Sequence, residues 1–350
     1  MDRRSWSSFL YYVFIDAILF LLTSGYTIVA LGSLALSLFK TGPSFFRKEK
    51  VPKPEVLKFG WKHGFADLSE IRMHYVEAGD SKAPLMLLIH GFPEFWYSWR
   101  HQLKYFAKSY HVVAIDMRGY GQTSKPDGIE NYDIKNLIKD VVEVMLATGH
   151  GQAYIVAHDW GANVAWYLAA VHPELVKKLI ILNMPHPTSF IKELTSSKEQ
   201  FFKSWYMFFF QFPYFPEFFF EHTSNKNLIG VFTHPPSGLI NSENFTPEDA
   251  DAWRYTFQER NSLTEPINYY RAAKRRLCLG TTIITDLIKP ETLIIWGAKD
   301  SALNLSAAED SLTRCEKATI KIILNASHWV QQDEPDLVNE YIEDFLSGDE

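Results

Sequence analysis

The sequence has little cysteine, no clustered metal ligands and no long block of basic residues. Two cysteines, Cys278 and Cys315, are too few for a disulfide framework, and the 12 histidines are scattered without the spacing of metal ligands. The formal net charge is -6 and basic residues cluster only over 40–53, which argues against nucleic acid as the main partner. We therefore expect no metal, no other cofactor and no nucleic acid.

Internal repeats and low-complexity tracts are also absent from the 350 residues. With 47% hydrophobic and 15% aromatic residues, the chain can bury one large core that carries an inserted subdomain. This composition excludes the collagenous and disordered classes.

What the sequence does contain is a long apolar run over residues 9–39 with a single charge, Asp16. The uncharged part is long enough to cross a bilayer as a helix, and the run exceeds the apolar core of a cleaved signal peptide. We therefore expect residues 9–39 to form a transmembrane anchor. Residues 40–60, with prolines and alternating charges, are expected to be a linker.

The charges beside this run predict its orientation. The basic residues after it, which outnumber those before it, are Lys40, Arg47, Lys48, Lys50 and Lys53, against Arg3 and Arg4. The positive-inside rule then places the C-terminal part in the cytosol, and a formal glycosylation acceptor at Asn325, beside a candidate site residue, favours the same side. We expect a single-pass membrane protein of the endoplasmic reticulum with a cytosolic catalytic domain.

Apolar strand-like segments alternate with amphipathic helical segments after the linker. The expected strands cover 71–76, 85–90, 112–115, 154–157, 179–182, 292–296 and 320–324, and the expected helices include 137–146 and 162–170. This alternation predicts an α/β fold with a mostly parallel sheet and helices on both faces. It is interrupted over 186–288, so we expect a core in two parts, 61–185 and 289–350, with a helical cap over 186–288 between them.

The expected cap is rich in aromatic residues over 201–220, where Pro213 and Pro216 break the helical pattern. Packing against the core, a lipophilic substrate tunnel and a second membrane-touching surface each explain such a composition. The first two explanations are compatible with each other.

A nucleophile elbow is indicated by residues 157–161, AHDWG, which stand between an apolar strand and a helix. Small residues stand two before and two after Asp159, as a sharp strand-to-helix turn requires. The aspartate occupies the place of serine in Gly-x-Ser-x-Gly hydrolases. Taken alone, Asp159 could equally be a helix cap.

Asp300 and His328 each follow an expected strand, and the chain order nucleophile, acid, histidine is that of the α/β-hydrolase fold. Their coincidence with the elbow favours a catalytic triad over a second helix cap and a core histidine. The sequence HGFP at 90–93 follows another buried strand. The backbone N–H groups of Phe92 and Trp160 are therefore expected to form an oxyanion hole.

With these motifs the chain resembles the epoxide hydrolases of the α/β-hydrolase fold. The segments that carry the resemblance are HGFP at 90–93, RGYG at 118–121, HDWG at 158–161 and SHW at 327–329, within residues 60–345. The run GFPEFWYSWR at 91–100 and the N-terminal anchor resemble the membrane-anchored group of epoxide hydrolases 3 and 4. We expect His90, Phe92 and Trp160 to contact the substrate.

The family also carries two lid tyrosines, which the resemblance places at Tyr270 and Tyr206, with Tyr214 as the alternative to Tyr206. An ionised Asp159 can attack an epoxide carbon without a base and give an ester that water cleaves, whereas serine would give an ether. A lid tyrosine can protonate the leaving alkoxide. His328 would then activate water, and the product would be a vicinal diol.

Two alternatives stay open. A haloalkane or haloacid dehalogenase of the same fold shares the aspartate and the histidine, although Phe92, Asn163 and the lid tyrosines weigh against it. A catalytically idle, membrane-tethered binding protein requires a misassembled triad.

The anchor and the aromatic cap lead us to expect a lipophilic epoxide, such as an epoxy fatty acid, as the substrate. The sequence predicts no oligomeric state.

Overall fold

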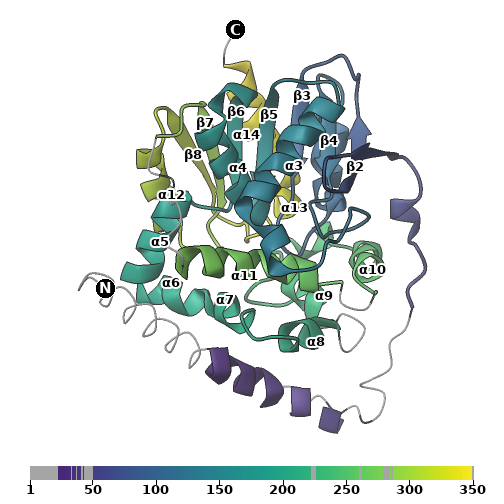
Figure 1. Ribbon diagram of the computed structural model, residues 1–350, viewed down its shortest axis with the longest axis vertical. Coiled ribbons are helices and arrows are strands. Elements are labelled where there is room, and N and C mark those ends of the chain that lie inside the picture. The colour runs from purple at the N-terminus through teal and green to yellow at the C-terminus, as the bar shows by residue number, and fades with distance from the viewer. Residues whose placement is uncertain are drawn as a thin grey trace, which may run out of the picture.

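One eight-stranded sheet forms the centre of the computed structural model (Figure 1). The structure describes residues 23–32, 34–36, 38–40, 42, 50–221, 226–259, 262–278, 284 and 287–348. The strands are β1 (Lys62–Asp67), β2 (Arg72–Ala78), β3 (Leu85–Ile89), β4 (His111–Ile115), β5 (Ala153–His158), β6 (Val176–Leu182), β7 (Thr292–Gly297) and β8 (Ala318–Ile323). Their order is β1-β2-β4-β3-β5-β6-β7-β8. The pairs β1–β2 and β2–β4 are antiparallel and the other pairs are parallel, which confirms the mostly parallel sheet.

Helices cover both faces of this sheet. Helices α3 (Ile134–Ala147) and α4 (Asp159–Val171) lie in front of it in Figure 1 and pack on each other. Helix α14 (Pro335–Ser347) lies behind it and contacts α2 (Arg100–Phe106). Strands β3, β4 and β7 consist only of buried residues, as expected for strands covered on both faces.

The chain between β6 and β7 forms a layer of short helices, called the cap below. They are α5 (Pro187–Ser196), α6 (Lys198–Lys203), α7 (Trp205–Phe209), α8 (Phe215–Glu221), α9 (Lys226–Thr233), α10 (Pro247–Thr256) and α11 (Thr264–Cys278). Figure 1 shows them beneath the sheet, and Lys203 Nζ donates to the carbonyl oxygen of Asp300 just after β7. The cap therefore faces the edge at which the parallel strands end. Three shorter helical segments follow the last strands: α12 (Leu305–Ser311), η7 (Leu312–Arg314) and α13 (Val330–Asp333).

Proline and capping residues explain why the cap helices begin where they do. Pro187 and Pro247 stand in the first turns of α5 and α10, where a missing N–H costs no hydrogen bond. The Thr246 side chain accepts from the N–H of Asp249 while the Asp249 carboxylate accepts from the N–H of Thr246, so a capping box opens α10.

Helical residues also occur between 23 and 39, within the expected anchor, while residues 9–22, 33 and 37 of that anchor lie outside the described residues. In the part of the chain that the structure describes, no helix has the length and hydrophobicity that a membrane span needs.

Candidate active site

The elbow is a tight turn that only small neighbours permit. Strand β5 ends at His158 and α4 begins at Asp159, whose backbone φ of 47° lies in the left-handed region. A Cβ on Gly161 would lie 2.3 Å from the carbonyl oxygen of Ile89, and a Cβ on Gly91 would lie 2.4 Å from Cβ of Asp159. The helix at Gly161 therefore packs directly on the backbone of Ile89, which explains why the sequence pattern has a small residue two positions after Asp159.

The Asp159 carboxylate is buried and held at both oxygens. Its Oδ1 accepts a hydrogen bond of 2.8 Å from the N–H of Phe92, and its Oδ2 lies 3.5 Å from Nε2 of His328. Burial raises the pKa of Asp159, but the hydrogen bond and charge of His328, with smaller effects of His158 and Phe92, outweigh burial and lower that pKa. The carboxylate is therefore ionised at neutral pH.

His328 lies between two carboxylates. Its Nδ1–H donates to Asp300 Oδ2 at 2.7 Å, and its other ring nitrogen faces Asp159. Burial lowers the pKa of His328, but the charge of Asp300 and the hydrogen bonds to both carboxylates outweigh burial and raise that pKa to about 10. The structure thus brings the three residues of the expected triad together, with His328 as an imidazolium.

Asn183, which the sequence reasoning missed, holds Asp300. Its Nδ2 donates to Asp300 Oδ2 at 2.7 Å, while its Oδ1 accepts from the N–H of Gly297 at 2.9 Å. Asn183 has a φ of 42°, a conformation that asparagine tolerates better than most residues. Its one sequence signal is that it directly follows β6, at the same edge of the sheet as the elbow.

Glu94 and His158 form a second pair that the sequence reasoning missed. Glu94 Oε2 accepts from the N–H of Gly91 at 2.9 Å and from Nδ1 of His158 at 2.6 Å, and two glutamine side chains of α13 donate to Oε1. The Nε2–H of His158 donates to the carbonyl oxygen of His328 at 2.8 Å. Both ring nitrogens of His158 thus lie against acceptors, and the Glu94–His158 contact joins the loops of Gly91, the elbow and His328.

Two tyrosines of the cap lie near Asp159. Tyr206 belongs to α7 and Tyr270 to α11, and their ring centroids are 5.9 Å apart. Burial and then the charge of Asp159 raise the pKa of both hydroxyls, so both keep their protons at neutral pH. Tyr214 lies between α7 and α8 and is 86% exposed, which leaves Tyr206 as the tyrosine that faces the site.

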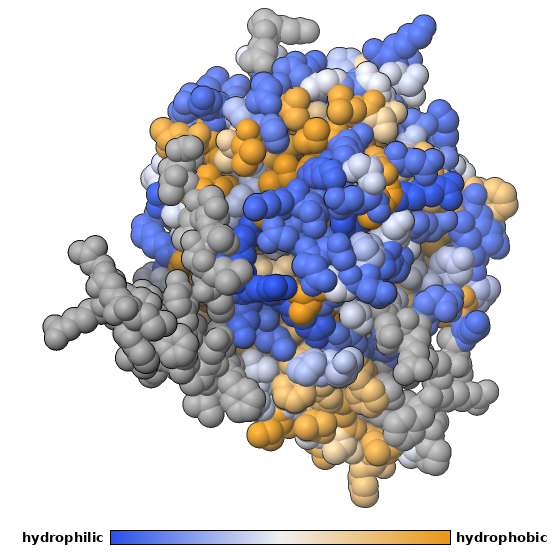
Figure 2. Space-filling model, viewed as in Figure 1, coloured by the Kyte–Doolittle hydropathy of each residue, from blue (hydrophilic) through white to orange (hydrophobic). Residues whose placement is uncertain are grey.

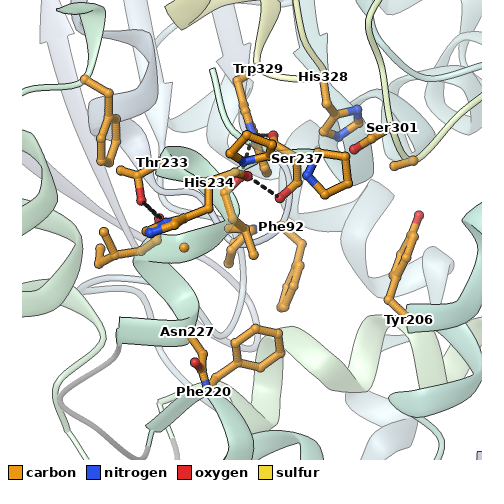
Figure 3. Close-up of a pocket in the computed structure, with 18 of the residues that line it drawn as sticks. Phe92, Tyr206, Phe220, Asn227, Thr233, His234, Ser237, Ser301, His328 and Trp329 are labelled. Carbon is orange, nitrogen blue, oxygen red and sulfur yellow. Dashed lines mark hydrogen bonds between the residues drawn. The ribbon is translucent and has the colours of Figure 1, made fainter. Parts of the chain in front are cut away.

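A cavity of about 1020 Å³ lies over this arrangement. Tyr206, Phe92 and His328 line it, and Figure 3 shows Tyr206 across the open space from Phe92, with its hydroxyl turned toward the side of His328. The other aromatic residues in the wall are Trp205, Phe210, Phe219, Phe220, Phe245 and Trp329. Within the described residues, no group of three or more His, Cys, Asp or Glu side chains could hold a metal ion.

The structure places two expected substrate contacts away from the cavity wall. His90 is fully buried: its Nε2 accepts from the N–H of Met117 at 3.0 Å, and its Nδ1–H donates to the carbonyl oxygen of Gly91 at 2.8 Å. Trp160 packs edge-on against Tyr270 at 4.9 Å. Both side chains therefore support the site from outside the wall. The backbone N–H of Trp160 lies in the first turn of α4, where it has no intrahelical acceptor.

The sheet, the cap between β6 and β7 and the aspartate at the elbow define an α/β hydrolase whose elbow residue is a carboxylate. A family model described as "alpha/beta hydrolase fold" matches residues 84–335. The chain is 45% identical to epoxide hydrolase 1 of Caenorhabditis elegans, over 98% of this chain and 85% of that relative. It is 41% identical to human epoxide hydrolase 4, over 79% and 76% of the two chains.

A solved structure agrees with these relatives. The crystal structure of Bacillus megaterium epoxide hydrolase in complex with an inhibitor has a TM-score of 0.75 to this chain at 30% identity, over 81% of this chain and 99% of that one. The chain belongs to the epoxide hydrolase family of α/β hydrolases.

Proposed function

We propose that this protein is an epoxide hydrolase that converts lipophilic epoxides, such as epoxides of long-chain fatty acids, to vicinal diols. The observation that carries the proposal is an ionised Asp159 at the elbow, with His328 on one side and two protonated tyrosines near it. The family relatives named epoxide hydrolases support the same activity. Activity on a halide would need no proton donor, so the tyrosines favour an epoxide over a dehalogenation substrate.

In the first half-reaction, Asp159 Oδ2 attacks an epoxide carbon and the C–O bond of the ring breaks. Tyr206 or Tyr270 gives a proton to the leaving alkoxide. The N–H of Phe92 holds Oδ1, which becomes the carbonyl oxygen of the ester.

Ester formation also converts His328 from an acid to a base. The ester carries no charge, so one of the two carboxylates that hold the pKa of His328 at about 10 is lost. The imidazolium can then release its proton, which restores the tyrosine. Neutral His328, oriented by Asp300, takes a proton from water that attacks the ester carbonyl. Collapse releases the diol and restores the Asp159 carboxylate.

The cavity supports a lipophilic substrate. At about 1020 Å³ it is at the upper end of ordinary ligand pockets, and its wall is mostly apolar with many aromatic side chains. Burying an apolar chain there is favourable by roughly 25 cal/mol per Å² of apolar area. A large apolar epoxide therefore gains more from this wall than a small polar one.

The test is the enzyme–substrate adduct of His328→Gln. The variant retains Asp159 but has no base for ester hydrolysis, so incubation with a lipid epoxide is expected to add the mass of the substrate to the peptide that contains Asp159. A panel of lipid epoxides with one haloalkane runs beside it. An adduct that forms with the haloalkane alone would favour the dehalogenase, and the lack of any adduct would refute this chemistry.

We also propose that residues 9–39 anchor the protein as a single-pass helix in the endoplasmic reticulum, with the catalytic domain in the cytosol. The single charge in that run and the excess of basic residues after it support this orientation. Protease treatment of sealed vesicles with the cytosolic side out is expected to digest the catalytic domain. A protected domain would contradict the proposed orientation.

A further inference from the structure

A buried carboxylate outside the triad ties the loop of His328 to the cap. Asp333 ends α13 and is fully buried. Its Oδ2 accepts from the N–H of Ser327 at 2.6 Å and from the N–H of Ile240 at 3.1 Å, and its Oδ1 accepts from the N–H of Asn241 at 2.7 Å. One side chain thus joins the residue before His328 to the cap segment between α9 and α10.

Trp329 makes a second connection on the other side of His328. Its Nε1–H donates to the carbonyl oxygens of Ser237 at 2.8 Å and Val231 at 3.1 Å. Its ring packs against Phe232, with centroids 4.4 Å apart. In Figure 3 the indole of Trp329 lies beside Ser237, and dashed lines mark hydrogen bonds among the residues drawn.

The cap residues that accept the hydrogen bonds of Trp329, Val231 and Ser237, are part of the cavity wall, and the chain runs on from Ser237 to the residues that bind Asp333. Residues 229–231 and 233–237 line the cavity, as Trp329 itself does. The His328 ring has its short hydrogen bond on the Asp300 side, while its Nε2 lies 3.5 Å from Asp159 Oδ2. The backbone position of the His328 loop therefore decides where Nε2 lies above the ester carbonyl, and the cap segment helps to fix that backbone.

We propose that Asp333 and Trp329 are positioning residues that hold His328 in place for ester hydrolysis by fixing its loop to the cavity wall. The inference rests on the proposed function, since it concerns the second half-reaction of that chemistry. An asparagine at position 333 would offer one acceptor oxygen and turn an N–H donor toward other N–H donors. The side chain could then not satisfy all three backbone groups that Asp333 binds.

The experiment measures both half-reactions in the full chain carrying Asp333→Asn. Rapid mixing with a lipid epoxide, acid quenching and mass spectrometry give the rate constants of ester formation and ester hydrolysis. Ester hydrolysis is expected to fall about 10- to 100-fold, as for loss of one hydrogen bond to a charged group. Ester formation does not use the base and is expected to stay within about twofold. The fraction of enzyme present as ester at steady state then rises.

Asp336→Asn is the matched control, because Asp336 is exposed three residues further along the chain and undergoes the same loss of charge. It is expected to behave as wild type. Trp329→Phe keeps an aromatic ring but removes the indole N–H, so ester hydrolysis should fall by a smaller factor than in Asp333→Asn while ester formation stays within about twofold. This variant decides the matter if Asp333→Asn does not fold.

An equal fall in both half-reactions, or no change in either, would overturn the positioning role and leave epoxide hydrolysis intact. Failure of the proposed function has a different signature: in that case the His328→Gln chain itself forms no ester, whatever residue stands at position 333.

Discussion

The site has two halves that are held in different ways. The core half consists of Asp159, Asp300 and His328, and the cap half consists of Tyr206 and Tyr270. In the core, Asp159 and Asp300 accept hydrogen bonds of 2.7–2.9 Å from backbone N–H groups and from Asn183. In the cap, Tyr206 and Tyr270 are surrounded by aromatic rings at centroid distances of 4.8–5.9 Å. Directional hydrogen bonds fix an atom more narrowly than ring contacts do. Hydrogen bonds therefore fix the carboxylates of the core half, whereas ring packing holds the tyrosines of the cap half.

The cap also carries apolar residues on the molecular surface. Figure 2 shows polar residues across the middle of the visible face and apolar residues both in its upper part and at its lower edge. Exposed aromatic side chains of the cap include Phe202, Trp205, Tyr214 and Phe218. The cap thus carries apolar surface both inside, around the cavity, and outside.

The largest effect is expected from the core half. Asp159→Ala removes the atom that forms the ester, so turnover of a lipid epoxide should fall by at least about 10⁴-fold. Diol formation is measured by chromatography, with circular dichroism as the check that the variant folds. Residual turnover close to wild type would mean that water attacks the epoxide directly and that Asp159 is not the nucleophile.

In the cap half, the two tyrosines are expected to share one task. Tyr206→Phe and Tyr270→Phe should each lower the rate of ester formation about 10- to 100-fold, and the double variant by about 10²–10⁴-fold. Tyr214→Phe is the control, because Tyr214 is 86% exposed and should give wild-type rates. If the double variant forms ester as fast as wild type, the cap supplies no proton.

The charge coupling across the core half can be measured on His328. Because Asp159 helps to raise the pKa of His328 to about 10, that pKa should fall in Asp159→Ala. An NMR titration of the His328 ring measures the change. A raised pKa in the folded state stabilises the protein fully below pH 6.5, and this contribution is lost as the pH rises from 6.5 to about 10. An unchanged pKa in Asp159→Ala would show that the two groups do not interact.

The smallest effect concerns the packing under the elbow. Gly161→Ala would place a Cβ 2.3 Å from a backbone oxygen, so the free energy of unfolding should fall by about 1–3 kcal/mol. Gly151→Ala is the control, since a Cβ there would meet nothing within 4 Å. If Gly161→Ala and Gly151→Ala have equal free energies of unfolding in urea titrations, the backbone under the elbow can move to accept the extra Cβ, and the core half is not held more tightly than the cap half.

The sequence predicted the sheet where the strands are buried on both faces, because short uninterrupted apolar runs such as 154–157, alternating with amphipathic helical segments, are typical of a parallel sheet. It did not predict β1 (Lys62–Asp67), in which Ala66 is the one buried residue. An edge strand with so little buried surface has no clear hydrophobic period.

Within the site, the residues with a local motif were predictable and their supports were not. Asp159 was found from its small neighbours. Asn183 and Glu94 act through partners 117 and 64 residues away, and no periodicity or spacing marks such contacts. The choice between Tyr206 and Tyr214 likewise depended on which of the two side chains lines the cavity. Aromatic residues surround both in the sequence, so packing alone separates them.

The covalent ester on Asp159 can be tested most directly with isotopically labelled water. A single turnover of excess enzyme with a lipid epoxide in ¹⁸O-water is followed by mass spectrometry of the diol and of the peptide that contains Asp159. If the carboxylate is the nucleophile, the first diol carries an oxygen from Asp159 and no label, and the label enters the carboxylate. A labelled diol with an unlabelled Asp159 would contradict the ester.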